Sequence, residues 1–112
     1  MSAAPNIIQN NIKKIALRAK VYAAIREYFH NNQVLEVHTP VLSHTGVTDV
    51  HLRAFQVKSD FHAAYWLHMS PEIAMKKLLS AGSGCIYQIA SVFRDGGEFG
   101  RYHRPEFAML EW

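Results

Sequence analysis

Cysteine and long hydrophobic runs are scarce in this sequence. Cys85 is the single cysteine among 112 residues, so no disulfide framework can form within the chain, and a lone thiol suits a reducing compartment. The apolar runs are only a few residues long, whereas a helix needs about 20 apolar residues to cross a bilayer. The first residues also lack the charged and apolar regions of a signal peptide. These absences predict a soluble, cytoplasmic, single-domain protein with no membrane association.

Motifs for metal binding and covalent catalysis are missing as well. The seven histidines show no His-Glu-x-x-His spacing, and no cysteine pair exists, so we predict no zinc site. No serine or cysteine stands in a nucleophile motif. The net charge of +3 is weakly basic, which suits a partner that carries phosphate or carboxylate. The basic residues are not interleaved with aromatic ones, which argues against a plain nucleic-acid-binding module.

The N-terminal part of the chain has a clear helical period. Apolar residues recur at helical spacing from Ile12 to Phe29, with charged residues between them. Asn10 or Asn11 is expected to cap the start of this helix. The pair Asn31-Asn32 is expected to end it, because asparagine tolerates the left-handed conformation.

The rest of the chain predicts strands and a second helix. Residues 34–39 form a β-prone run, and Pro40 closes it because proline cannot donate to a central ladder. The other expected elements are strands around 52–57 and 64–69, a helix from Ser70-Pro71-Glu72 to Ala81, and two strands over 85–94 and 105–112. The last strand alternates, with Phe107, Met109 and Glu111 on one face. The expected fold class is α+β, an antiparallel sheet flanked by helices.

The chemical signal lies in Phe93-Arg94-Asp95 and in residues 102–107, which a glycine-rich loop joins. An arginine at the end of a buried strand is costly unless an anion satisfies it, and its planar fork matches phosphate or carboxylate. Phe107 could stack on a flat base. The pattern predicts a nucleotide-phosphate site. The alternative is a charged hairpin, in which the arginines pair with Asp95, Glu98 and Glu106.

Three segments together resemble the catalytic domain of class II aminoacyl-tRNA synthetases of the lysine branch. The stretch FRDGGEFGRYHRPEFAMLEW, within residues 90–112, is similar to motif 2 of that family. The helix and strand leading to Pro40, over about residues 12–42, are similar to motif 1. Between them, His68-Met69-Ser70-Pro71-Glu72 with Lys76 resembles the segment that binds the amino acid. The resemblance covers nearly everything from residue 12 onward, as the N-terminal part of one catalytic domain.

The resemblance implies ATP-dependent formation of an aminoacyl-adenylate, with Arg94 as the catalytic residue that binds the α-phosphate and the amino-acid carboxylate. Phe107 would stack on adenine, and Pro40 would support a homodimer interface. Glu72 would hold the substrate's amino group, although an acid in the first turn of a helix is also simply a good cap. The remaining residues implied for ATP are Asp95, Glu98, His103 and Arg104, and those implied for the amino acid are Ser70, Pro71 and Glu106.

Two departures from the family pattern stand in motif 2, and a third motif is missing. Arg104 replaces the usual asparagine, and the loop around Glu98 is one residue longer than the common form. The third motif, which holds the far side of ATP, and the acidic ligands of Mg²⁺ are absent from the sequence. We therefore expect this chain to be part of a longer fold that supplies the Mg²⁺ ligands.

The resemblance leaves three functions open. With only about eleven residues before the first motif, and with Gly100-Arg101-Tyr102-His103, the chain is most similar to a stand-alone paralogue that attaches β-lysine to a lysine of elongation factor P. The alternative is a catalytic-domain segment of a lysyl-tRNA synthetase, with lysine and tRNA-Lys as substrates. A non-catalytic dimerisation module is the third possibility.

Overall fold

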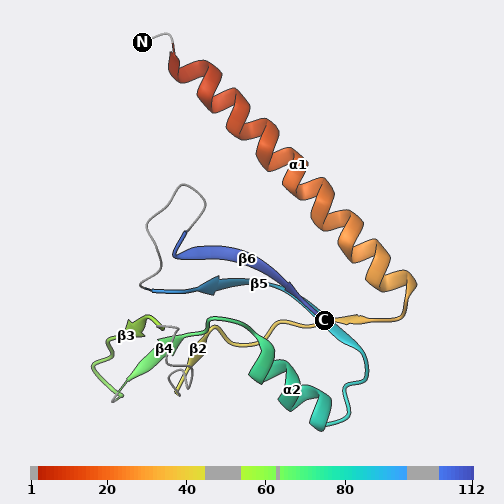
Figure 1. Ribbon diagram of the computed structural model, residues 1–112, viewed down its shortest axis with the longest axis vertical. Coiled ribbons are helices and arrows are strands. Elements are labelled where there is room, and N and C mark those ends of the chain that lie inside the picture. The colour runs from red at the N-terminus through yellow and green to blue at the C-terminus, as the bar shows by residue number, and fades with distance from the viewer. Residues whose placement is uncertain (1–2, 45–53, 63, 96–103) are drawn as a thin grey trace. The chain divides into compact units, whose positions relative to one another are not determined.

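The computed structural model describes residues 3–44, 54–62, 64–95 and 104–112 (Figure 1). Contacts within the chain divide it into two compact units, Met1–Val34 and Leu35–Trp112. The first unit holds the helix α1, and the second holds the helix α2 and all the strands. Neither helix in the described ranges has both the length and the apolar character needed to span a membrane.

The helix α1 covers Ala3–Asn31 and so begins earlier than predicted. Asn10 and Asn11 lie inside it, and the prediction that one of them caps its start was wrong. The residues before them allow helix, because alanine has the highest helix propensity. Pro5 is tolerated because the first turn has no use for its missing N–H group.

The C-terminal end of α1 also differs from the prediction. Gln33, with φ of 61°, takes the left-handed conformation that was expected of Asn31-Asn32. The Val34 N–H donates to the Phe29 carbonyl at 2.9 Å, and the Gln33 N–H donates to the His30 carbonyl at 3.1 Å. These two bonds form a Schellman motif with Gln33 at its left-handed position. Asn32 takes another role, because its side-chain amide donates to the Tyr28 carbonyl at 2.7 Å.

The larger sheet of the second unit has the strand order β1-β5-β6. Its strands are β1 Leu35–Glu36, β5 Ile86–Phe93 and β6 Glu106–Glu111. The β5–β6 pair is antiparallel over its whole length, as predicted, whereas β1 runs parallel to β5. The pairing of β6 with β5 confirms the predicted alternation of β6. Phe107, Met109 and Glu111 lie opposite Val92, Ala90 and Gln88.

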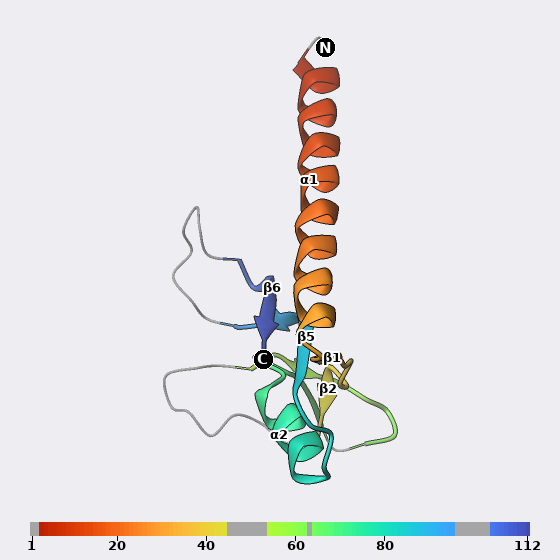
Figure 2. The same cartoon turned by 90° about the vertical axis from the view of Figure 1, so that its right-hand side faces the viewer.

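The smaller sheet is antiparallel, with the order β2-β4-β3. Its strands are β2 Leu42–Ser43, β4 Tyr65–Leu67 and β3 Gln56–Val57. The helix α2, Glu72–Ser80, follows β4 and leads back to β5 (Figures 1 and 2). Gly82, with φ of 93°, follows α2 at the predicted position. Ser70 accepts the Glu72 N–H at 3.3 Å, so the serine acts next to the helix start, where Pro71 is the N-cap residue. The α+β class is confirmed.

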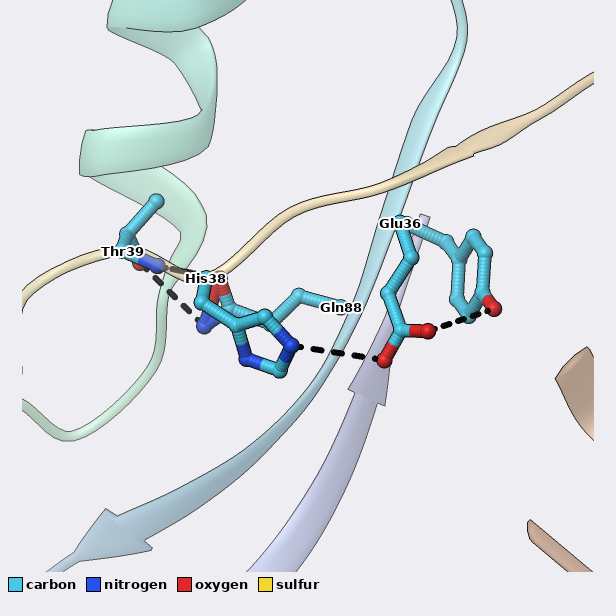
Figure 3. Close-up of polar contacts among 5 residues, drawn as sticks. Glu36, His38, Thr39 and Gln88 are labelled. Atoms are coloured by element: carbon cyan, nitrogen blue, oxygen red, sulfur yellow. Dashed lines mark hydrogen bonds and ion pairs between the residues drawn. The ribbon is translucent and has the colours of Figure 1, made fainter.

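Pro40 stands where the chain passes from one sheet to the other. Before it, Thr39 is held against β5 by the buried Gln88, whose Oε1 accepts the Thr39 N–H at 2.8 Å (Figure 3). After it, the Val41 carbonyl accepts the His68 N–H at 2.9 Å, beside β4. The predicted strand 34–39 is therefore ladder-paired only at its start. A residue without an N–H group fits the crossing point, because no ladder bond is made there.

The core of the second unit is centred on β5, and includes Tyr87 on one face, 2% exposed, and four residues on the other. Gln88 is 2% exposed and Val92 is fully buried, and Ile86 and Ala90 on the same face are buried with them. Met75 of α2 is also buried. The site described next lies at the end of this buried strand.

Candidate functional site

Arg94 follows directly after β5, at the edge of the buried face. Its Nη2 atom lies 3.5 Å from the Met69 carbonyl oxygen, and its Cζ lies 5.3 Å from the centre of the Phe107 ring. Its Nε is buried and has no hydrogen-bond partner among the described residues. A buried guanidinium N–H without an acceptor costs free energy. Because an anion would supply that acceptor, Arg94 has the surroundings of a ligand-binding arginine.

Phe107 is placed by the pairing of β6 with β5. It lies opposite Val92. Two positions along the same ladder, the Arg94 N–H donates to the Pro105 carbonyl at 2.9 Å. This register brings the aromatic ring under the guanidinium, in a cation–π contact. The ring is half-buried. Arginine and a partly open aromatic face therefore stand together at the sheet edge.

The segment before α2 reaches the same site. The Met69 carbonyl meets Arg94, Pro71 is fully buried, and Glu72 lies exposed at the start of α2. Glu72 Oε1 forms an ion pair with Lys76 Nζ at 2.8 Å. The hydrogen bond and charge of Lys76 lower the pKa of Glu72. The same bond, with the charge of Glu72 and then of Glu111, raises the pKa of Lys76.

The other predicted site residues are placed as follows. Asp95 and Arg104 are exposed, and Glu106 lies opposite Phe93, on the other face of the ladder from Phe107. Glu98 and His103 lie outside the described residues. Within the described ranges, no ion pair joins Arg94 or Arg104 to Asp95 or Glu106. The charged-hairpin alternative therefore finds no support in the part of the chain that the structure describes.

Two residues appear in the sequence patterns but were given no role of their own. His68 bonds to β5 through both its ring and its carbonyl, and Glu111 acts on the charge of Lys76 from the end of β6. The alternation of β6 put Glu111 on the face of Phe107, so its position could have been found. Nothing in the local pattern around His68 signals its contacts, because they depend on how β4 meets β5.

The arrangement offers complementary groups for a ligand of mixed charge. The guanidinium of Arg94 suits phosphate or carboxylate, and the Phe107 face suits a flat ring. The carboxylate of Glu72, which already pairs with Lys76, suits an ammonium group. Among the described residues, no three side chains of the histidine, cysteine, aspartate or glutamate type gather in a metal-binding group.

Comparisons with known proteins identify the family. Residues 7–112 match the family described as tRNA synthetases class II (D, K and N). The chain is 50% identical over 108 residues to the elongation factor P–(R)-β-lysine ligase of Vibrio parahaemolyticus, and 51% identical over 107 residues to that of Avibacterium paragallinarum. The ligase of Haemophilus influenzae is 50% identical over 109 residues. Each alignment covers 91% of this chain and 33% of the relative.

The chain thus spans about a third of the length of the curated relatives that it matches. The family match, by contrast, extends over nearly the whole chain and includes all three segments that resemble the lysine branch. The chain therefore belongs to the class II tRNA synthetases of the D, K and N type.

Proposed function

We propose that this chain forms part of an ATP-dependent ligase that activates lysine or β-lysine as an aminoacyl-adenylate and transfers it to a lysine of elongation factor P. The observation that carries the proposal is Arg94, whose buried Nε has no hydrogen-bond partner among the described residues and whose Cζ lies over the Phe107 ring. The similarity to ligases with this name supports the choice of amino acid and acceptor.

The proposed reaction begins with attack of the amino-acid carboxylate on the α-phosphorus of ATP. An oxygen–phosphorus bond forms, the bond to the pyrophosphate oxygen breaks, and pyrophosphate leaves. Arg94 would bind both the carboxylate and the α-phosphate, holding them in line and offsetting the negative charge that develops. The adenine would stack on Phe107. In the second step, the ε-amine of the acceptor lysine attacks the carbonyl carbon, an amide forms, and AMP leaves.

The substrate's amino group would be held by Glu72. Because Lys76 already pairs with this carboxylate at 2.8 Å, an incoming ammonium group shares it with an internal cation. Ser70 and Pro71 belong to the same segment, and the burial of Pro71 fixes where the segment runs. Glu106, Asp95 and Arg104 keep their predicted roles as proposals, as do Glu98 and His103.

The proposal includes a homodimer, a cytoplasmic location and Mg²⁺ as the companion of ATP. Ile8, Ile12 and Ile15 are 57%, 58% and 67% exposed and lie on one face of α1, which supports a partner surface there. We propose one catalytic domain, of which residues 1–112 form the N-terminal part, with motif 1 at about 12–42 and motif 2 at about 90–112. The third motif and the Mg²⁺ ligands would lie outside these residues.

The test is calorimetric titration with a non-hydrolysable lysyl-adenylate analogue. We expect the unmodified protein to bind the analogue and Arg94→Ala to lose at least roughly 100-fold in affinity, because a charged hydrogen bond and a stacking partner are removed together. Arg18→Ala is the matched control, since Arg18 also stacks on an aromatic ring, that of Tyr22 at 5.0 Å, but lies on α1.

Acceptor choice is decided with the full-length protein. Radiolabelled β-lysine and lysine are each offered with elongation factor P or with tRNA-Lys, and the labelled product is measured. Labelled elongation factor P supports the proposal, whereas labelled tRNA alone would assign the chain to the lysyl-tRNA synthetases. A folded dimer that binds no analogue would instead favour a dimerisation module.

A further inference from the structure

The edge of β5 that faces away from β6 is completed by two different segments. Along its first half, the carbonyls of Cys85 and Tyr87 accept the N–H groups of Leu35 and Val37 at 3.0 and 2.9 Å. The period of two along a strand directs the backbone groups of Ser91 and Phe93 to this same edge. There β1 has already turned away toward Pro40, so these groups need another partner.

His68 supplies that partner with both its backbone and its ring. The His68 carbonyl accepts the Phe93 N–H at 3.1 Å. Its ring Nε2 lies 2.6 Å from the Ser91 carbonyl oxygen. Its own N–H donates to the Val41 carbonyl at 2.9 Å. One residue thus joins the ends of β2, β4 and β5.

The contact with Ser91 fixes which ring nitrogen carries hydrogen. A carbonyl oxygen only accepts, so Nε2 must be the donor. The bond therefore requires hydrogen on Nε2, which both the Nε2–H tautomer and the imidazolium form carry. The imidazole replaces the backbone N–H group that a continuing strand would have offered at this place.

Met69, the next residue, connects His68 to the candidate site. Met69 follows His68 directly, and its carbonyl lies 3.5 Å from Arg94 Nη2. Arg94 itself follows Phe93, whose N–H is bonded to His68. Both sides of the Arg94–Met69 contact are therefore tied to His68.

We propose that His68 is a positioning residue for adenylate formation, because it locks the segment 69–72 onto β5 and so sets where the Arg94 guanidinium stands. This inference rests on the proposed function for its readout. It assigns no contact between His68 and the substrate. The part of the side chain that matters is the Nε2–H donor, and not the aromatic ring.

The experiment uses steady-state ATP–pyrophosphate exchange by the full-length protein with lysine or β-lysine. His68→Leu removes the donor at similar size, and His68→Gln keeps an amide N–H at a comparable reach. We expect His68→Leu to lose roughly tenfold in kcat/KM, as for the loss of one hydrogen bond that leaves its partner displaced. The loss should appear in the KM of the amino acid as well as in kcat. His68→Gln should recover to within about threefold of the unmodified protein.

Arg94→Lys and the double variant test whether His68 acts through Arg94. Coupled residues give a combined effect that differs from the product of the separate ones. We expect His68→Leu to cost no more than about twofold once Arg94→Lys is present. The matched control is His62→Leu, a histidine of the same sheet region that contacts the Tyr65 ring and should leave the kinetics unchanged.

Three results would overturn the inference: unchanged kcat/KM in His68→Leu, equal losses in His68→Leu and His68→Gln, or independent effects of His68→Leu and Arg94→Lys. Nitrogen-edited NMR of the histidine rings adds a direct check, because a His68 ring without hydrogen on Nε2 at neutral pH contradicts the bond. Absence of exchange in the unmodified protein would count against the proposed function, and the NMR result would still decide the contact.

Discussion

Glu72 and Lys76 lie one helical turn apart at the start of α2 and form an ion pair at 2.8 Å. The pair lowers the pKa of Glu72 and raises that of Lys76. Because the folded pKa of Glu72 is lowered, its stabilising contribution is complete above the ordinary glutamate pKa. That contribution is lost as the pH falls through the lowered value.

We expect the carboxyl carbon of Glu72 to titrate below an ordinary glutamate in an NMR pH series. Lys76→Met should move the midpoint upward, because it removes the hydrogen bond and the positive charge and keeps the side-chain length. Lys77→Met is the control, since Lys77 is also exposed on α2. A Glu72 midpoint that is the same in both variants would contradict the pairing.

At the residue scale, the identity of the candidate site residues was easier to predict than the hydrogen bonds that they make. Arg94 and Phe107 could be singled out because a charged, planar side chain at a strand end and an aromatic one on the paired strand are visible in the pattern. The burial of Arg94 Nε, without an acceptor in the part of the chain that the structure describes, could not be foreseen, because it depends on how residues 69–72 cross the sheet edge. The same holds for the bond between the Gln88 side chain and Thr39, 49 residues apart.

The two helices end in the same way but with different residues. In α2, the Ser83 N–H donates to the Leu78 carbonyl at 3.1 Å, and the Gly82 N–H donates to the Leu79 carbonyl at 3.0 Å. This is the Schellman pattern of α1, with Gly82 in the place of Gln33. Glycine enters the left-handed region without steric cost, whereas a residue with a Cβ is penalised there.

We expect Gln33→Gly to stabilise the protein and Gly82→Gln to destabilise it, each by about 1 kcal/mol in the free energy of unfolding. Nothing lies within 4 Å of a Cβ built on Gly82, so the cost there should come from the backbone alone. Urea denaturation followed by circular dichroism measures both changes. Gln56→Gly on β3 is the control, where the same substitution should destabilise. An unchanged midpoint in Gln33→Gly would show that its conformation is not strained.

Element boundaries were predictable where a strong local signal exists. The start of α2 and its end before Gly82 follow from the residues themselves. The predicted start of α1 was wrong because Asn10 and Asn11 were interpreted as candidate N-caps. Asparagine is also tolerated in the interior of a helix, at a modest cost in free energy. The strand before Pro40 was expected to be longer than Leu35–Glu36. The chain leaves β5 there and passes to the smaller sheet, and no local sequence pattern signals that change of hydrogen-bond partner.

The whole molecule presents an apolar stripe on α1 that the proposed homodimer would cover. We expect Ile12→Asp to weaken self-association by roughly tenfold or more in sedimentation velocity, because a carboxylate would be buried without a partner. Leu17→Asp is the matched control: Leu17 is 61% exposed, as Ile12 is 58% exposed, but lies on the opposite face of the helix. Equal effects of both variants would place the interface elsewhere.

At this scale the sequence indicated the fold class but not the topology. The antiparallel pair β5–β6 was expected because two consecutive β-prone runs are joined by a glycine-rich loop. The parallel pair β1–β5 was not, since periodicity says nothing about which distant strands become neighbours. The family resemblance supplied the expected order of segments, and the structure adds which backbone groups join them.

The position of β5 in the chain has a consequence for how the protein is made. Glu36 and its partner Tyr87 are 51 residues apart, and the ribosome adds about 5–20 residues per second. Synthesis of β5 therefore follows that of β1 by roughly 3–10 s. During that interval the nascent chain exposes Leu35 and the residues up to Pro40 as an open template for pairing. Chaperone binding to the nascent chain should accordingly be strongest after β1 has left the ribosome and should fall once β5 has emerged.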